Sequence, residues 1–161
     1  MIELDFDVKG IDGLNANFDA AEKWIKRPFE RGLSLKIRAI FNDEVDKQFK
    51  SKGAHFKTKW RPLSKDYKAW KDQEYPGRPL MVLTGKLKQS LMRANSRHAI
   101  FNVRRDRIIL GTRVPYAKEH QLGTDKPRRP LVLIVGNGSM QKRWSAAMLA
   151  AFKKRFGNSN G

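Results

Sequence analysis

The side chains in this sequence best placed for chemistry are cations in two short segments that are expected to be loops. One segment is the expected tip of a hairpin, and the other is a stretch stiffened by prolines. Cations carried on exposed loops are the groups that contact phosphates. No helix-turn-helix, zinc-finger or RNP-type motif accompanies them, so contact with nucleic acid would not depend on base sequence. The candidate contact residues are Arg104, Arg105, Arg107, Lys126, Arg128 and Arg129.

Groups that could catalyse a reaction or hold a metal are scarce. The three histidines, His55, His98 and His120, form no HExxH motif and no pair at helical spacing. His120 is expected to be a hydrogen-bonded structural residue. The acids at 43–46 are expected to fan outward from a helix into solvent. We therefore expect a protein that is not an enzyme and has no metal site or cofactor.

The positive charge of the chain is large and unevenly spread. The 34 Lys and Arg residues exceed the 16 Asp and Glu residues, which gives a formal net charge of +18. Residues 84–161 carry +14 and residues 1–83 carry +4, while the first 22 residues hold six acids and one base. A field of this kind attracts polyanions or acidic proteins. A basic surface that serves only solubility would explain +4 better than +14.

The 161 residues are expected to form a single domain, 1–161, with a real core. No apolar run is long enough to cross a membrane, and the N-terminus lacks the features of a secretory signal. The absence of cysteine excludes disulfides and is typical of a protein made in a reducing cytoplasm.

Hydrophobic periodicity predicts the elements of the first 50 residues. Residues 2–8 alternate apolar and acidic side chains, which predicts a half-buried strand. Leu14, Phe18, Ala21 and Ile25 recur at helical spacing, so residues 14–26 predict a short amphipathic helix with these residues as its apolar stripe. Residues 28–50 predict a second, longer helix, with Pro28 in its first turn. The apolar stripe of the second helix consists of Leu33, Ile37, Ile40, Phe41, Val45 and Phe49.

Residues 51–80 have few aliphatic side chains, so they predict a long, partly irregular insertion loop. Such a segment has little with which to bury itself. It is expected to be mobile in a free subunit or ordered against a partner. Four rings, Trp60, Tyr67, Trp70 and Tyr75, either pack the loop onto the body or stack on bases.

The second half of the chain predicts helices and one hairpin. A short helix with Thr84 as its N-cap comes first. Residues 98–103 and 107–112 then predict two antiparallel strands joined by a tight turn.

After the hairpin, a short helix from Pro115 is expected to stop at Gly123, and residues 131–135 predict a buried strand. Ser139 is expected to cap a last helix, and residues 157–161 to form a flexible tail. The fold class is therefore α+β, with a small, mostly antiparallel sheet on which the long helix and the C-terminal helix pack.

Four segments occur in an order that resembles a known family. They are WRPLSKDY at 60–67, LTGKLKQSL at 83–91, LGTRVPYAKEHQLGT at 110–124 and RRPLVLIV at 128–135. The pattern is similar to that of the virion morphogenesis, or tail-completion, family of tailed phages, of which the Mu-like members are closest. About half of the chain is covered. The matching residues, which are expected to be scaffold positions, are Trp60, Pro62, Leu63, Thr84, Gly85, Leu87, Gly111, Tyr116, Ala117, His120, Gly123, Arg129 and Pro130.

The resemblance implies a structural subunit that finishes tails or joins heads to tails. Its expected partners are other copies of itself in a ring, for which a hexamer is the expectation, and neighbouring neck and tail proteins. Sequence-independent contact with the DNA in the channel is a further expectation. The expected location is the neck or tail end of the virion, reached from the host cytoplasm during assembly.

Two other classes of function remain open from the residues. One is a free nucleic-acid-binding module without base specificity, and the other is a small nuclease or toxin-type enzyme. The place of Arg129 in the Arg-Pro pair also gives that residue a structural interpretation beside its role as a contact residue.

Overall fold

The computed structural model describes residues 11–132 and 138–157. The expected strand at 2–8 and the tail at 158–161 lie outside the described residues. The described elements are α1 (Ile11–Lys26), α2 (Arg31–Lys50), the 3₁₀ helix η1 (Ala54–Phe56), α3 (Lys65–Glu74), α4 (Lys86–Met92), β1 (Ala99–Val103), β2 (Ile108–Thr112), α5 (Ala117–Leu122) and α6 (Gly138–Phe156).

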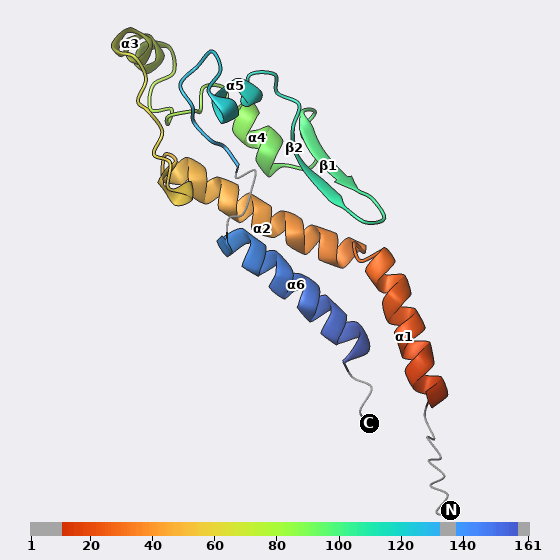
Figure 1. Ribbon diagram of the computed structural model, residues 1–161. Helices are drawn as coiled ribbons and strands as arrows, with labels where there is room; N and C mark the ends of the chain where they lie inside the picture. The colour runs from red at the N-terminus through yellow and green to blue at the C-terminus, as the bar shows by residue number, and fades with distance from the viewer. Residues whose placement is uncertain (1–10, 133–137, 158–161) are drawn as a thin grey trace, which may run out of the picture.

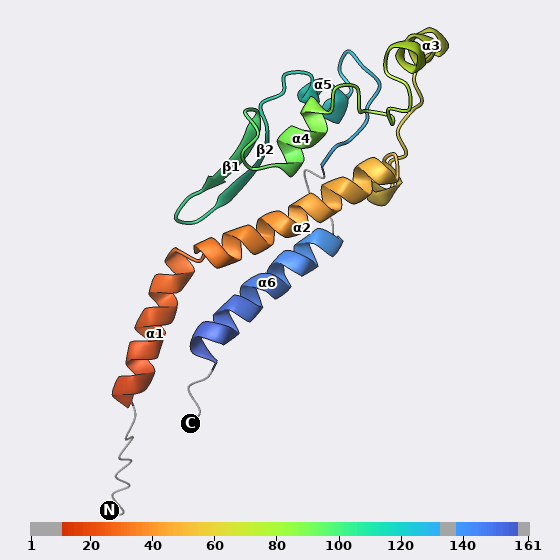
Figure 2. The same cartoon turned by 180° about the vertical axis from the view of Figure 1, so that it is seen from behind.

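Helix α2 is the centre of the molecule. It lies between α6 on one side and a layer of α4, α5 and the hairpin on the other (Figures 1 and 2). All six apolar residues of its predicted stripe are buried, as expected for a helix covered on two sides. The two long helices, α2 and α6, are antiparallel. Arg155 near the end of α6 pairs with Glu30 just before α2, and Arg143 near the start of α6 pairs with Glu44 further along α2. The predicted α+β class is confirmed, although α6 packs on α2 rather than directly on the sheet.

Helix α1 contacts the body through a different face from the one predicted. Trp24 is buried and meets the rings of Phe152 and Phe156 edge-on, at 5.6 and 6.2 Å between centroids. Phe18 and Ile25, which belong to the predicted apolar stripe, are 65% and 64% exposed. The choice between these faces depends on α6, far along the chain, and local periodicity cannot reveal it.

The predicted hairpin is confirmed. Strands β1 and β2 are antiparallel, with Ala99 opposite Thr112 and Val103 opposite Ile108. Within the described residues they form a two-stranded sheet. Residues 131 and 132 are not in a strand, and the rest of the strand expected at 131–135 lies outside the described residues.

Residues 51–80 are more regular than expected. The predicted loop was partly irregular, and the structure adds two elements that were not predicted: η1 and helix α3, whose first turn is capped by Ser64. Phe56 and Trp60 are buried, so the beginning of this segment is part of the core. The two predicted helix caps are wrong. Gly85, and not Thr84, is the residue directly before α4, and Ser139 lies inside the first turn of α6.

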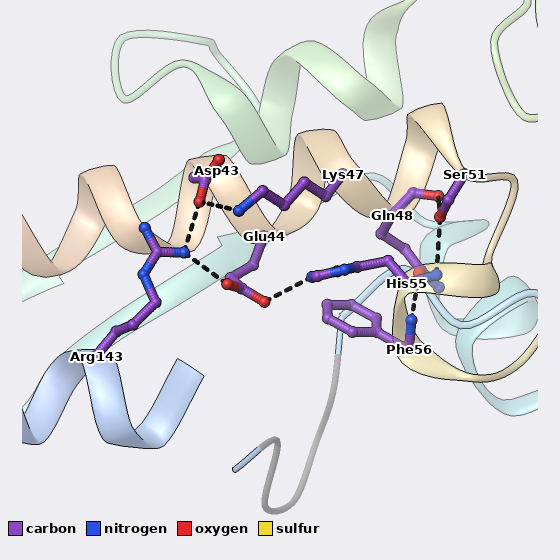
Figure 3. Close-up of polar contacts among 8 residues, drawn as sticks. All are labelled: Asp43, Glu44, Lys47, Gln48, Ser51, His55, Phe56 and Arg143. Carbon is purple, nitrogen blue, oxygen red and sulfur yellow. Dashed lines mark hydrogen bonds and ion pairs between the residues drawn. The ribbon is translucent and has the colours of Figure 1, made fainter. Parts of the chain in front are cut away.

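A buried carboxylate joins three elements (Figure 3). Glu44 of α2 is 1% exposed and accepts hydrogen bonds from Arg143 of α6 at 2.6 Å, while its second oxygen lies 2.7 Å from His55 Nε2. Arg143 also bonds Asp43 at 2.5 Å. The expectation that the acids at 43–46 all point into solvent is therefore wrong for Glu44. A carboxylate buried this deeply is stable only while its partners remain in place.

Across the described residues, no helix combines the length and the apolar character needed to cross a membrane.

Candidate binding site

A hollow of about 730 Å³ opens between α3, the segment before α4, α5 and residues 126–129. This volume is in the range of ordinary ligand sites. The elements that line the hollow lie toward the end of α2 that is away from α1 (Figures 1 and 2). Eight of the thirteen expected scaffold positions line the hollow, and they come from segments that are far apart in the chain. They are Pro62, Leu63, Thr84, Gly85, Leu87, Tyr116, His120 and Arg129.

Two glycines shape the walls of the hollow. Gly85 has φ +83° and directs the chain into α4, and Gly123 has φ +79° and ends α5. A Cβ on Gly123 would lie 2.7 Å from the Cβ of Arg128, so only glycine allows residues 124–129 to fold back on α5. At Gly111, another expected scaffold position, a Cβ would meet Ile100 at an ordinary 3.9 Å, so no close approach requires a glycine there.

Arg129 has a structural place rather than a surface one. It is 5% exposed, and its guanidinium donates to the carbonyl oxygens of Arg61 at 2.9 Å and Pro62 at 3.0 Å. Its backbone N–H donates to the carbonyl oxygen of His120 at 2.7 Å. Burial lowers the pKa of Arg129, and the charge of Arg61 lowers it further. Of the two interpretations of Arg129, the structure supports the structural one, and we remove it from the contact residues.

A second set of contacts ties the first motif to the last. The indole nitrogen of Trp60 and the side-chain amide of Gln48 both donate to the carbonyl oxygen of Pro130, at 2.9 and 2.8 Å. On the other side, Gln121 bonds the backbone of Leu131 and Val132. Sequence reasoning missed Gln48, which is fully buried, because a polar residue in a helix carries no local signal of burial.

The hollow combines apolar walls with positive charge. Its apolar walls include Leu63, Met81, Val82 and Leu83, and no carboxylate is among its described lining residues. The cations of the lining are two buried residues, Lys71 and Arg129, and two exposed residues at the rim, Lys86 and Lys126.

The buried and exposed cations behave differently. Lys71 is 4% exposed and donates to the carbonyl oxygens of Arg78 and Pro79, and its burial lowers its pKa. Lys126 pairs with Glu119 at 2.7 Å near the surface. A ligand would therefore meet the charges of Lys86 and Lys126 first. Lys71 and Lys86 were not predicted site residues, since isolated lysines in a lysine-rich chain give no signal.

His120 lines the hollow without the hydrogen bond that was expected. Its Nδ1 is buried and has no hydrogen-bond partner within the described part of the chain. Burial lowers the pKa of His120, and Arg129 and Lys126 lower it further. The imidazole is therefore held neutral near pH 7, and it adds a polar atom to an otherwise apolar wall.

The predicted cationic residues form two patches instead of one. Arg104, Arg105 and Arg107 are exposed at the tip of the hairpin, where Arg107 pairs with Asp106 at 2.8 Å. Lys126 and Arg128 are exposed beside the hollow. The hairpin tip points toward the α1 end of α2, and the 126–129 segment lies at the other end (Figures 1 and 2). A single ligand of small size cannot contact both patches.

No group of three or more His, Cys, Asp or Glu that could hold a metal occurs among residues 11–132 and 138–157. No family model, curated protein or solved structure matches this chain.

Proposed function

We propose that this chain is a structural subunit of a ring at the neck or tail end of a tailed-phage particle, where it completes the tail or joins it to the head. The observation that carries the proposal is the assembly of the four phage-like motifs into one place. Trp60 of the first motif and Pro130 of the last share a hydrogen bond, and residues of all four motifs line or support the hollow.

The charge of the molecule supports the same proposal. The exposed arginines at the hairpin tip suit either DNA passing through a ring or an acidic ring stacked on it. A closed ring also needs two different, complementary patches on each subunit. The exposed apolar residues Phe18 and Ile25 on α1 and Leu149 on α6 are available for such contacts.

The test is the state of assembly of the purified protein. Light scattering during gel filtration should give one discrete oligomer that persists as the salt concentration rises. A phage whose copy of this gene carries a stop codon should accumulate unjoined heads and tails, and the supplied protein should restore infectious particles. A protein that stays monomeric at all concentrations, in a phage mutant with normal joining, would contradict the proposal.

The alternative is a nucleic-acid-binding module without base specificity, which the net charge of +18 favours. Such a module would bind unrelated DNA sequences equally. Its affinity would fall steeply with salt, because the logarithm of the binding constant falls with the logarithm of the salt concentration by about 0.9 per phosphate contact. The two candidates differ in one measurement. Salt-resistant self-assembly without DNA supports the ring, and a monomer that gathers only on DNA supports the module.

A further inference from the structure

The hollow has the chemistry of a site for an extended segment that is apolar on one face and acidic on the other. Its walls are apolar, and its rim carries Lys86 and Lys126, of which Lys126 already pairs with Glu119 at 2.7 Å. The described lining residues themselves include no carboxylate. An apolar side chain entering it would leave water, and a carboxylate beside it would meet the rim lysines. A basic or purely polar segment would lose on both counts.

One segment of this chain has that pattern. Residues 2–8 read Ile-Glu-Leu-Asp-Phe-Asp-Val, so apolar and acidic side chains alternate without interruption. In an extended chain this alternation places the apolar side chains on one face and the acidic ones on the other. We propose that residues 2–8 of a neighbouring copy occupy the hollow, with apolar side chains against its walls and carboxylates toward Lys86 and Lys126.

The segment must come from another copy because of its distance from the hollow. Only Lys9 and Gly10 separate residue 8 from the start of α1, and they span about 10 Å when extended. Helix α1 begins beyond the far end of α2 from the hollow (Figure 1). Residues 2–10 together reach about 30 Å from the start of α1 when extended. Both the 16 residues of α1, about 24 Å long, and the 20 residues of α2, about 30 Å long, lie between that point and the hollow. The segment of one chain therefore cannot reach its own hollow.

This inference rests on the proposed ring, and it supplies that ring with an interface. Each subunit would give one segment and receive another, which is a heterologous contact of the kind that closes rings. It also gives a role to the acidic beginning of an otherwise basic chain.

The chain has no cysteine, so introduced cysteines can test the contact without background. Leu4→Cys chains and Leu83→Cys chains would be produced together with tags of different length and mildly oxidised. Leu83 lines the hollow, so a mixed covalent dimer is expected. The matched control pairs Leu4→Cys with Leu35→Cys, a residue that is exposed on α2 and belongs to no proposed contact. This control should give roughly tenfold less mixed dimer, as expected if the specific contact raises the affinity by about tenfold.

A charge exchange tests the same contact without a covalent bond. Lys86→Glu with Lys126→Glu should weaken assembly by about tenfold or more, because like charges then face each other. Adding Asp5→Lys and Asp7→Lys should restore assembly. Lys153→Glu with Lys154→Glu, an equal change of charge on α6, should have little effect, and thermal melts would verify that each variant folds.

The outcomes separate this inference from the proposed function. If the protein assembles but the Leu4–Leu83 pair cross-links no better than the control, the ring stands and the docked segment is refuted. Cross-linking only inside a single chain that carries both cysteines would refute exchange between copies. A wild-type protein that never assembles would overturn both. Preferential mixed dimers together with restoration by the charge exchange would support the inference.

Discussion

The indole nitrogen of Trp60 donates a hydrogen bond to the carbonyl oxygen of Pro130 over 2.9 Å. The two residues are 70 positions apart, in the first and the last of the four segments named in the sequence analysis. Next to this bond, Arg129 donates to the carbonyl oxygens of Arg61 and Pro62. The first and last motifs thus form one hydrogen-bonded unit beneath the hollow, and changes in this unit should affect stability before they affect contacts with a partner.

Replacing Arg129 by alanine should destabilise the fold by about 2 to 4 kcal/mol, because two buried carbonyl oxygens lose a charged donor. At about 2–4 °C per kcal/mol, the melting temperature should fall by several degrees. Arg128→Ala is the matched control, since Arg128 is exposed, and its melting temperature should stay at the wild-type value. Equal melting temperatures for Arg129→Ala and the wild type would return Arg129 to the contact residues.

Two glycine-to-alanine changes should have effects of opposite sign. Gly53 has φ +93°, and an added Cβ would lie 2.3 Å from the carbonyl oxygen of Thr58, so Gly53→Ala should cost at least about 2 kcal/mol. Gly32 lies in the first turn of α2 with no atom near its added Cβ, so Gly32→Ala should stabilise by roughly 0.5 to 1 kcal/mol. Urea unfolding measures both. A tolerated Gly53→Ala would mean that the turn at 51–60 is not as described.

The low pKa of His120 should make the fold weaker in mild acid. Its pKa in the folded state lies below the value of about 6.5 in the unfolded chain, so the unfolded state takes up protons first as the pH falls. The stability that the neutral His120 contributes is therefore fully present above pH ~6.5, and it is lost as the pH falls below that value. Comparing melting temperatures at pH 7.5 and pH 5 should show a smaller drop for His120→Asn than for the wild type. Identical drops would mean that folding does not lower the pKa of His120.

The hairpin tip should bind its target through charge alone. Arg104→Ala with Arg105→Ala should keep the wild-type melting temperature, because both side chains are exposed. If DNA is the target, the double variant should bind all DNA sequences more weakly and lower the salt slope by up to about 2. If an acidic protein ring is the target, DNA binding should be unchanged and fewer particles should be joined. The variant Lys153→Ala with Lys154→Ala removes the same charge elsewhere and is the control for both assays.

Hydrogen exchange should divide residues 51–80 into two parts. Residues 53–60 hold buried Phe56 and Trp60, and their amides bond the end of α2 and one another, so they should exchange slowly. Helix α3 is exposed along nearly all of its length apart from Lys71, so its amides should exchange quickly in a free subunit. Uniform protection across 51–80 in a monomer would contradict this division.

The sequence predicted elements whose signals are local. The apolar stripe of α2, the two strands around the hairpin turn and the stop of α5 at Gly123 all follow from spacing and from turn residues within a few positions. Helix α3 was predicted only as part of a partly irregular loop, because it has few aliphatic residues. Its support comes instead from the Ser64 cap and from the Lys68–Asp72 ion pair on its surface.

The site was predicted less well because it depends on distant segments. The exposed arginines of the hairpin tip follow from their place in a turn, but nothing local shows that Arg129 is buried and Arg128 is not. The same holds for Glu44, whose burial requires Arg143 of α6 and His55 of η1 (Figure 3). Motif residues could be named from the sequence, whereas the hollow that they line became visible only in three dimensions.

The central place of α2 has a consequence for how the protein is made. One covering layer comes from residues 86–122 and the other from α6, so the ribosome completes α2 long before either cover exists. About 100 residues lie between Val45 and Ala147. At about 5 to 20 residues per second, their synthesis takes roughly 5 to 20 s. During that time the apolar stripe of α2 has no native partner in α6. Apolar surface that is exposed in this way promotes aggregation, so early pairing of α2 with the hairpin layer would protect the nascent chain.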